Sequence, residues 1–171
     1  MKRCVGRIGL VIVLATLSRQ AHAQLGCLGS TCTIEITMPV SDVLRLSLST
    51  SSISLGTPTE SDFQAGYRDV HAVNVTAKSN RPFTVQLSGV TPAFSYSGTL
   101  PTPNKPASDL LWATSAGALS TASNTFGTTT TFLNQGAGAI TSPLFLRTLW
   151  SFANDVPGTY SLTIRFTLSA P

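Results

Sequence analysis

Few residues of this chain have the types and spacing that catalysis requires. The sequence holds two histidines, and only His71 lies beyond the first 23 residues. A Ser-His-Asp or Cys-His arrangement would therefore have to use His71. Because it stands beside Asp69 at the start of an alternating apolar stretch, we expect a solvated or hydrogen-bonded histidine at a strand end.

Two acidic residues close in sequence, Glu60 and Asp62, have the chemistry of a glycosidase pair. They lie in a polar, turn-rich stretch, Gly56 to Asp69, which we expect to be mainly loop. Two cysteines and one histidine cannot supply four ligands to a metal ion. The Gly-Ala repeat near Gly136 lacks the lysine of a phosphate-binding loop. We therefore expect no catalytic residue, no cofactor, no metal site and no enzymatic activity.

The first 23 residues have the parts of a secretory signal peptide. A basic start is followed by the apolar run Ile8–Leu17 and by an Ala-x-Ala cleavage site at Ala21–Ala23. A membrane anchor is the alternative, but the apolar run is too short to span a bilayer. We expect cleavage after residue 23 and export to the periplasm, the cell surface or the medium.

Removal of the signal peptide changes the charge balance. The formal net charge of +4 comes entirely from basic residues inside it, because residues 24–171 hold equal numbers of basic and acidic side chains. Neither sign is clustered, so a nucleic-acid partner is not expected. Residues 24–171 also contain no further apolar run of membrane-spanning length.

Cys27 and Cys32 remain after cleavage, and in an exported protein such a pair predicts a disulfide. The alternative is lipidation of Cys27. Gly26 fits the small residue that precedes a lipidated cysteine, whereas Gln24 stands where such sites prefer leucine. Residues 24–32 are therefore taken as an N-terminal segment ahead of the folded domain.

Alternating apolar residues recur over residues 33–171 and predict short strands separated by Gly, Pro and Asn turns. We expect an all-β fold, a single immunoglobulin-like antiparallel β-sandwich of about eight strands, with no helix. Residues 73–77 and 83–87 flank a Lys-Ser-Asn-Arg-Pro turn and predict a hairpin. Residues 90–109 predict a long loop, and Tyr160 to Leu168 predict a closing strand.

Aromatic residues offer a second kind of site, a surface for stacking against sugars. Trp112 and Trp150 lie in predicted strands, where a tryptophan is more often part of the core. Phe94 and Tyr96 lie in the proline-rich loop and are the better candidates for exposed recognition. Tyr160 follows a Pro-Gly turn and is expected to return its hydroxyl to nearby backbone, as in a tyrosine corner.

The two ends of the domain resemble known bacterial surface proteins. The stretch Val-Pro-Gly-Thr-Tyr-Ser-Leu-Thr-Ile-Arg-Phe-Thr-Leu (156–168) resembles the last strand of spore coat U and chaperone–usher pilin-like subunits. Residues 32–40 resemble a pilin-type N-terminal strand. WxL-type domains are a more distant likeness, with Phe166–Leu168 standing where their Trp-x-Leu lies. The resemblance implies an incomplete sandwich that a neighbour's strand completes.

That resemblance assigns the donor role to four apolar residues that share one face: Ile34, Ile36, Met38 and Val40. The function expected is a non-enzymatic cell-surface or pilus-like structural or adhesion subunit, whose partners are copies of itself or related subunits. The alternative is a secreted or cell-wall-associated monomeric module that binds, for example, carbohydrate. In that case the same four residues would pair within their own sheet.

Overall fold

The computed structural model describes residues 34–171 and shows an all-β fold of antiparallel sheets. Its compact unit is residues 40–171, and residues 34–39 belong to a separate N-terminal unit. The expected signal peptide and the Cys27–Cys32 disulfide lie outside the described residues. Neither of the two α-helices within residues 34–171 has the length and hydrophobicity to cross a membrane.

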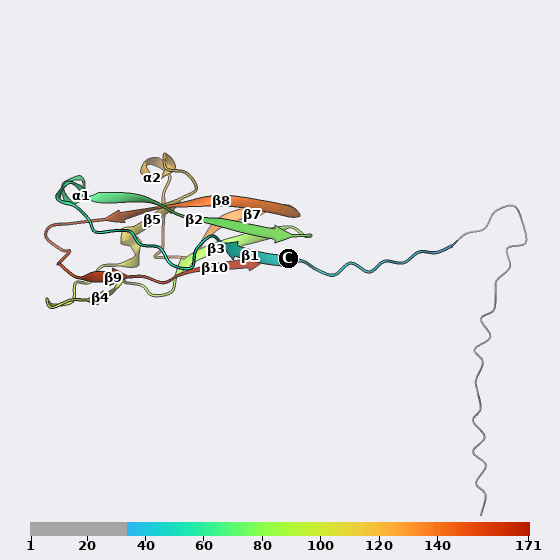
Figure 1. The fold of residues 1–171 in the computed structure, drawn as a ribbon, viewed down its shortest axis with the longest axis horizontal. Helices are drawn as coiled ribbons and strands as arrows, with labels where there is room; N and C mark the ends of the chain where they lie inside the picture. Colours follow the sequence, from blue (N-terminus) through green and yellow to red (C-terminus); the bar gives the residue numbers. More distant parts are fainter. Residues whose placement is uncertain (1–33) are drawn as a thin grey trace, which may run out of the picture. The chain divides into compact units, whose positions relative to one another are not determined.

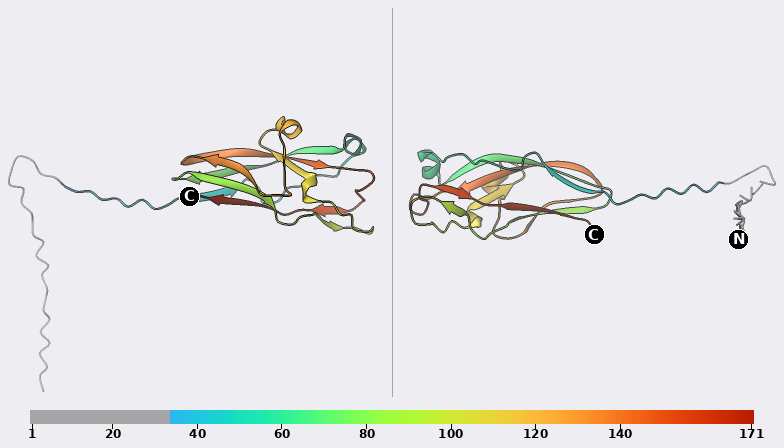
Figure 2. Two further views of the ribbon diagram at one scale, coloured as in Figure 1. Left: turned by 180° about the vertical axis from the view of Figure 1, so that it is seen from behind. Right: turned by 60° about the horizontal axis from the view of Figure 1, so that its bottom comes forward.

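Ten strands of the described chain form three sheets, with strand orders β1-β2-β8-β5-β6, β10-β3-β7 and β4-β9 (Figure 1). The first two sheets face each other as the layers of the sandwich, which Figure 2 shows from two further sides. The strands are β1 (Leu44–Leu48), β2 (Tyr67–Ser79), β3 (Phe83–Gly89), β4 (Ser95–Ser97), β5 (Leu110–Ala113), β6 (Asn124–Thr125), β7 (Thr130–Gln135), β8 (Gly138–Leu149), β9 (Thr159–Ser161) and β10 (Ile164–Ser169).

The core lies between the two larger sheets and is built by the alternation that the sequence displays. Every second side chain of β2 and of β3 points inward, and Val75 and Val85 are fully buried. Trp112 from β5 is also buried and packs against Phe132 with ring centroids 5.5 Å apart. The expectation that Trp112 belongs to the core is confirmed.

The predicted hairpin between β2 and β3 is wrong. The two strands follow each other along the chain, but β2 pairs with β1 and β8, whereas β3 pairs with β10 and β7. The turn between them therefore carries the chain from one layer of the sandwich to the other. Alternation reports which face of a strand is buried, and two strands facing each other across a core have the same alternation as two strands side by side.

The polar stretch expected to be loop contains a helix, α1 (Glu60–Ala65). Thr59 and Asp62 form a capping box at its start, and Gly66 ends it with a φ of 78°. The expectation of no helix is therefore wrong. A second short helix is α2 (Ala118–Thr121), and a 3₁₀ turn, η1, spans Ala107–Asp109.

Three other stretches differ from the sequence prediction. The loop expected at residues 90–109 contains β4 as well as η1. Strand β8 begins at Gly138, within the Gly-Ala repeat near Gly136, a stretch expected to lie between strands. The predicted closing strand is divided at residues 162–163 into β9, which pairs with β4, and β10, which pairs with β3.

Candidate functional site

The sandwich has two sheet edges that face each other on one side, β1 in the first sheet and β10 in the second. The inward side chains of β10 are only half-buried. In the pairing register, Phe166 lies opposite Leu87 and Leu168 lies opposite Val85. The two β3 residues are 0% exposed, whereas their β10 partners remain partly accessible. The apolar inner face of this sheet is therefore buried at the central strand β3 and partly exposed at the edge strand β10.

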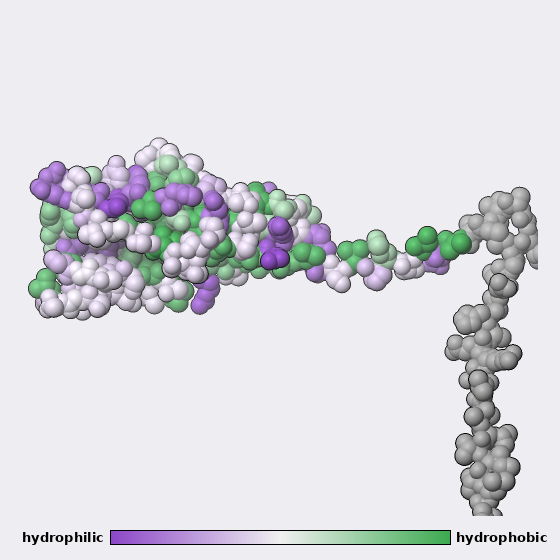
Figure 3. Space-filling view, in the orientation of Figure 1, coloured by the Kyte–Doolittle hydropathy of each residue, from purple (hydrophilic) through white to green (hydrophobic). Residues whose placement is uncertain are grey.

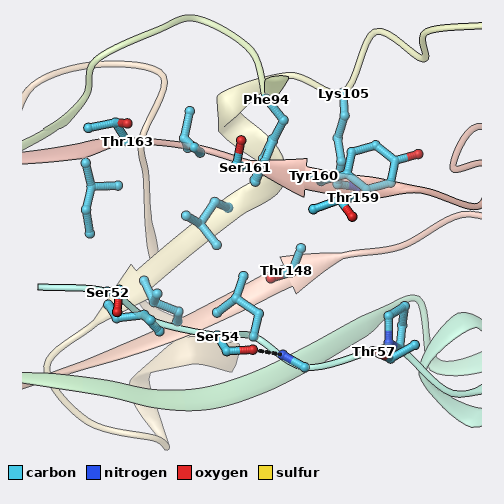
Figure 4. A pocket seen from close by; sticks show the side chains of 18 of the residues that line it. Ser52, Ser54, Thr57, Phe94, Lys105, Thr148, Thr159, Tyr160, Ser161 and Thr163 are labelled. Atoms are coloured by element: carbon cyan, nitrogen blue, oxygen red, sulfur yellow. Dashed lines mark hydrogen bonds between the residues drawn. The ribbon is translucent and has the colours of Figure 1, made fainter. Parts of the chain in front are cut away.

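An open groove of about 720 Å³ lies along this side of the molecule. One wall is residues 51–58, which follow β1, and the other is residues 158–164, which cover β9 and the start of β10. In Figure 4 the two walls run across the picture with side chains directed into the space between them. The space-filling view shows hydrophobic residues exposed between the two layers on this face (Figure 3). The floor and one end are formed by Leu110, Leu146, Thr148, Lys105 and Trp150.

The first wall has strand-like side chains but an unpaired backbone. Ile53 and Leu55 are half-buried against the core, and Ser54 between them is exposed. The last backbone bond that joins this segment to β2 is from Ser49 to the carbonyl of Asn74. Within residues 34–171, the amides of Ile53 and Leu55 have no hydrogen-bond partner. The wall therefore offers amide donors to an added strand.

The four predicted donor residues are exposed and lie in no strand of the described chain. Ile34, Ile36, Met38 and Val40 are 85%, 88%, 79% and 74% exposed, and no strand is assigned to residues 34–43. Single exposed apolar residues are common on proteins, but four on one face of a short segment are not.

Residues 41–43, at the start of the compact unit, are fixed to the turn between β2 and β3. The side chain of Asn80 accepts from the amide of Val43 at 2.9 Å and donates to the carbonyl of Ser41 at 2.9 Å. Arg81 forms an ion pair with Asp42 at 2.7 Å. The point from which the preceding segment leaves the compact unit is therefore held at one end of β1.

Of the two residues expected to serve loop recognition, Phe94 lines the groove from the core side and Tyr96 does not line it. Phe94 is 9% exposed and belongs to the core, so its expected exposure is wrong. Tyr96 is half-buried, and its hydroxyl donates to the carbonyl of Pro157 at 2.8 Å. The pairing of β4 with β9 explains both positions, because it folds the proline-rich loop back onto the sandwich.

The expected tyrosine corner is confirmed. The hydroxyl of Tyr160 donates to the carbonyl of Val156 at 2.8 Å and accepts from its amide at 2.9 Å. Burial raises the pKa of Tyr160 above its ordinary value of 10. Because Tyr160 also lines the groove, this corner fixes the turn from which the second wall begins.

Replacing Tyr160 with Phe should lower the free energy of unfolding by about 1–2 kcal/mol, since two hydrogen bonds are lost and the amide of Val156 is left unpaired. The raised pKa adds a pH signature. The neutral hydroxyl stabilises the wild type fully below about pH 10 and loses this effect as the pH rises through the folded-state pKa. Urea unfolding at pH 7 and pH 11 checks both, with Tyr96→Phe as the control. Equal stability of Tyr160→Phe and the wild type at pH 7 would contradict this role.

The residues considered for catalysis have structural partners. Asp62 caps α1, and hydrogen bonds from the backbone and side chain of Thr59 lower its pKa. His71 is exposed and lies against Phe145, with ring centroids 5.0 Å apart. Asp69 pairs with Arg147 at 2.7 Å rather than with His71. Within residues 34–171, no group of three potential metal ligands is found.

No family model matches the chain, and no curated protein matches it. The fold and the site together define an antiparallel β-sandwich with an open groove between two sheet edges, in a chain that also carries an exposed alternating segment.

Proposed function

We propose that this protein is an exported bacterial structural subunit of a cell-surface or pilus-like assembly, and that a strand from another molecule completes its sandwich. The observation that carries the proposal is that Tyr160, Leu162 and Ile164, on the wall of the groove, are only half-buried. Apolar side chains at a sheet edge favour an added strand, which buries them and supplies backbone partners at the same time.

The exposed segment, residues 34–40, has the length and pattern that the groove requires. Seven residues in extended form span about 23 Å, and the wall 158–164 also has seven residues. Alternation places Ile34, Ile36, Met38 and Val40 on one face, so all four can enter the groove together. Glu35 and Thr37 would point to solvent.

The expected gain is large enough for stable association. Full burial of an aliphatic side chain contributes about 1.5–3 kcal/mol, so four contribute roughly 6–12 kcal/mol before the costs of ordering the segment. Backbone hydrogen bonds to the amides of Ile53 and Leu55 would add to this.

The reach of the segment favours donation between molecules. If residues 34–40 folded back from Ser41 along β1, they would extend about 23 Å. The wall of the groove starts ten residues beyond Ser41, which corresponds to about 33 Å of extended chain. The molecule's own residues 34–40 would then stop short of residue 51. A second copy has no such restriction.

A peptide titration tests the proposal. A synthetic peptide of residues 34–40 is added to protein that begins at Ser41, and the tryptophan fluorescence is followed, because Trp150 lines the groove and contributes to it. Saturable binding with a rise in melting temperature is expected, because a ligand of the folded state alone stabilises it. The control is the same peptide with Ile36→Asp.

Equal binding of both peptides, or of neither, would contradict the proposal. The alternative function, a monomeric module that binds carbohydrate, predicts instead that oligosaccharides change the tryptophan fluorescence while the peptide does not. The hydroxyl groups of Ser52 and Ser54 on the first wall give this alternative its chemical basis.

A further inference from the structure

A buried lysine stands at one end of the groove, between two carboxylates. The side chain of Lys105 is 2% exposed, and its Nζ lies 2.9 Å from Oδ1 of Asp155 and 3.4 Å from Oδ2 of Asp109. Asp155 is also buried, at 5% exposure, whereas Asp109 is 31% exposed. Figure 4 shows Lys105 extending towards the wall that carries Tyr160.

We propose that Lys105 and Asp155 become joined by an intramolecular isopeptide bond. The amine and the carboxyl group are held in contact by residues 50 positions apart in the sequence. Such placement turns a bimolecular condensation into an effectively unimolecular one. The proposal concerns the folded subunit alone and does not rest on strand donation.

Both reacting groups are oriented by further hydrogen bonds. Nζ donates to three acceptors, the carbonyl of Leu149 at 2.6 Å and the carboxylates of Asp109 and Asp155, which hold the amine in contact with both acidic side chains. The amide of Ser151 donates to Oδ2 of Asp155 at 2.8 Å. That amide would stabilise the negative charge that develops on Oδ2 during attack at Cγ, as an oxyanion-hole donor does.

Asp109 is placed to carry the proton. Its carboxylate accepts a proton from Nζ, and the amine that results attacks Cγ of Asp155. Asp109 passes this proton to Oδ1 and then carries a second proton from Nζ to the same oxygen, so that Oδ1 leaves as water when the Cγ–Oδ1 bond breaks. The ammonium and the carboxylate become one amide and one water molecule. Charge balances, and no oxidant, reductant or activated donor is needed.

The pair is shielded from water on one side and open to it on the other. The ring of Trp150 lies 4.6 Å from Nζ and covers the lysine. On the other side, a cavity of about 500 Å³ lined by Asp109, Asn154 and Asp155 provides a route by which the released water leaves. The bond would tie the loop before η1 to the loop between β8 and β9.

Mass spectrometry of the purified full chain, reduced and denatured, tests the bond. We expect an intact mass that is one water molecule lower than the mass calculated from the amino-acid sequence of the purified protein. A digest should contain a peptide with Lys105 joined to a peptide with Asp155. Recovery of Lys105 and Asp155 in separate unmodified peptides would overturn the proposal and leave an ion pair only.

Two variants separate the bond from the ion pair. Lys105→Arg keeps the positive charge but removes the amine that would form the amide with Asp155. This variant should therefore have its calculated mass, without the loss of one water molecule. Asp109→Asn removes the proton carrier at a partly exposed position, where folding should persist, and should reduce the cross-linked fraction at least tenfold. A cross-link that forms to the same extent in Asp109→Asn would overturn the role of Asp109 as proton carrier. If Lys105→Arg fails to fold, the intact mass of the wild type still shows whether the isopeptide bond has formed.

Discussion

Replacing Ile36 with Asp should abolish assembly and leave the subunit folded. Ile36 is 88% exposed in the isolated subunit, so the added charge has no cost there. In the proposed complex the same side chain enters an apolar groove, where an unpaired carboxylate costs several kcal/mol. A loss of about 3 kcal/mol already corresponds to more than a hundredfold in affinity. Sedimentation velocity of the variant should give monomers only.

Thr37→Asp is the matched control, because it adds the same charge to the neighbouring residue on the opposite face of the segment. It should assemble as the wild type does. One result for these two variants would contradict strand donation between molecules. If Ile36→Asp lowers the unfolding midpoint of the subunit while Thr37→Asp does not, the segment contributes to its own fold and donation between molecules is wrong.

Replacing Leu162 with Arg should disable the groove while leaving the donor segment intact. Leu162 lies in the wall between β9 and β10 and is half-buried in the subunit. The longer charged side chain would occupy the space that an added strand needs. A loss of at least a hundredfold in self-association is expected, again from about 3 kcal/mol.

Mixing the two variants gives a sharper result than either alone. Leu162→Arg can donate but not accept, and Ile36→Asp can accept but not donate, so the mixture should form dimers and no longer species. Thr167→Arg on the outward face of β10 is the control and should polymerise normally. Long oligomers in the mixture, or none of any kind, would contradict the pairing of this segment with this groove.

The sequence predicts the strands better than their partners. Alternation at Val73 to Ala77 and at Phe83 to Leu87 correctly indicates two strands with buried inner faces, and both are central to the core. It does not reveal that β2 and β3 lie in different sheets. That choice depends on packing between segments far apart in the chain, such as β10 against β3.

The same limit explains which parts of the site could be predicted. The apolar face of residues 34–40 and the hydroxyl bonds of Tyr160 follow from local pattern and turn chemistry. The helix α1 could also have been predicted from the sequence, because Thr59 and Asp62 have the spacing of a capping box. The groove could not have been predicted, since it depends on where the pairing of β1 with β2 ends. Phe94 was misjudged because β4 folds its loop onto the core.

The most direct test of strand donation is the molar mass of the purified protein in solution, measured by size-exclusion chromatography with light scattering, with and without residues 34–40. The account predicts concentration-dependent oligomers for the chain that retains the segment. It predicts a folded monomer for the form that begins at Ser41. A monomeric long form, with a short form that unfolds or aggregates, would contradict the account and place the segment in its own sandwich.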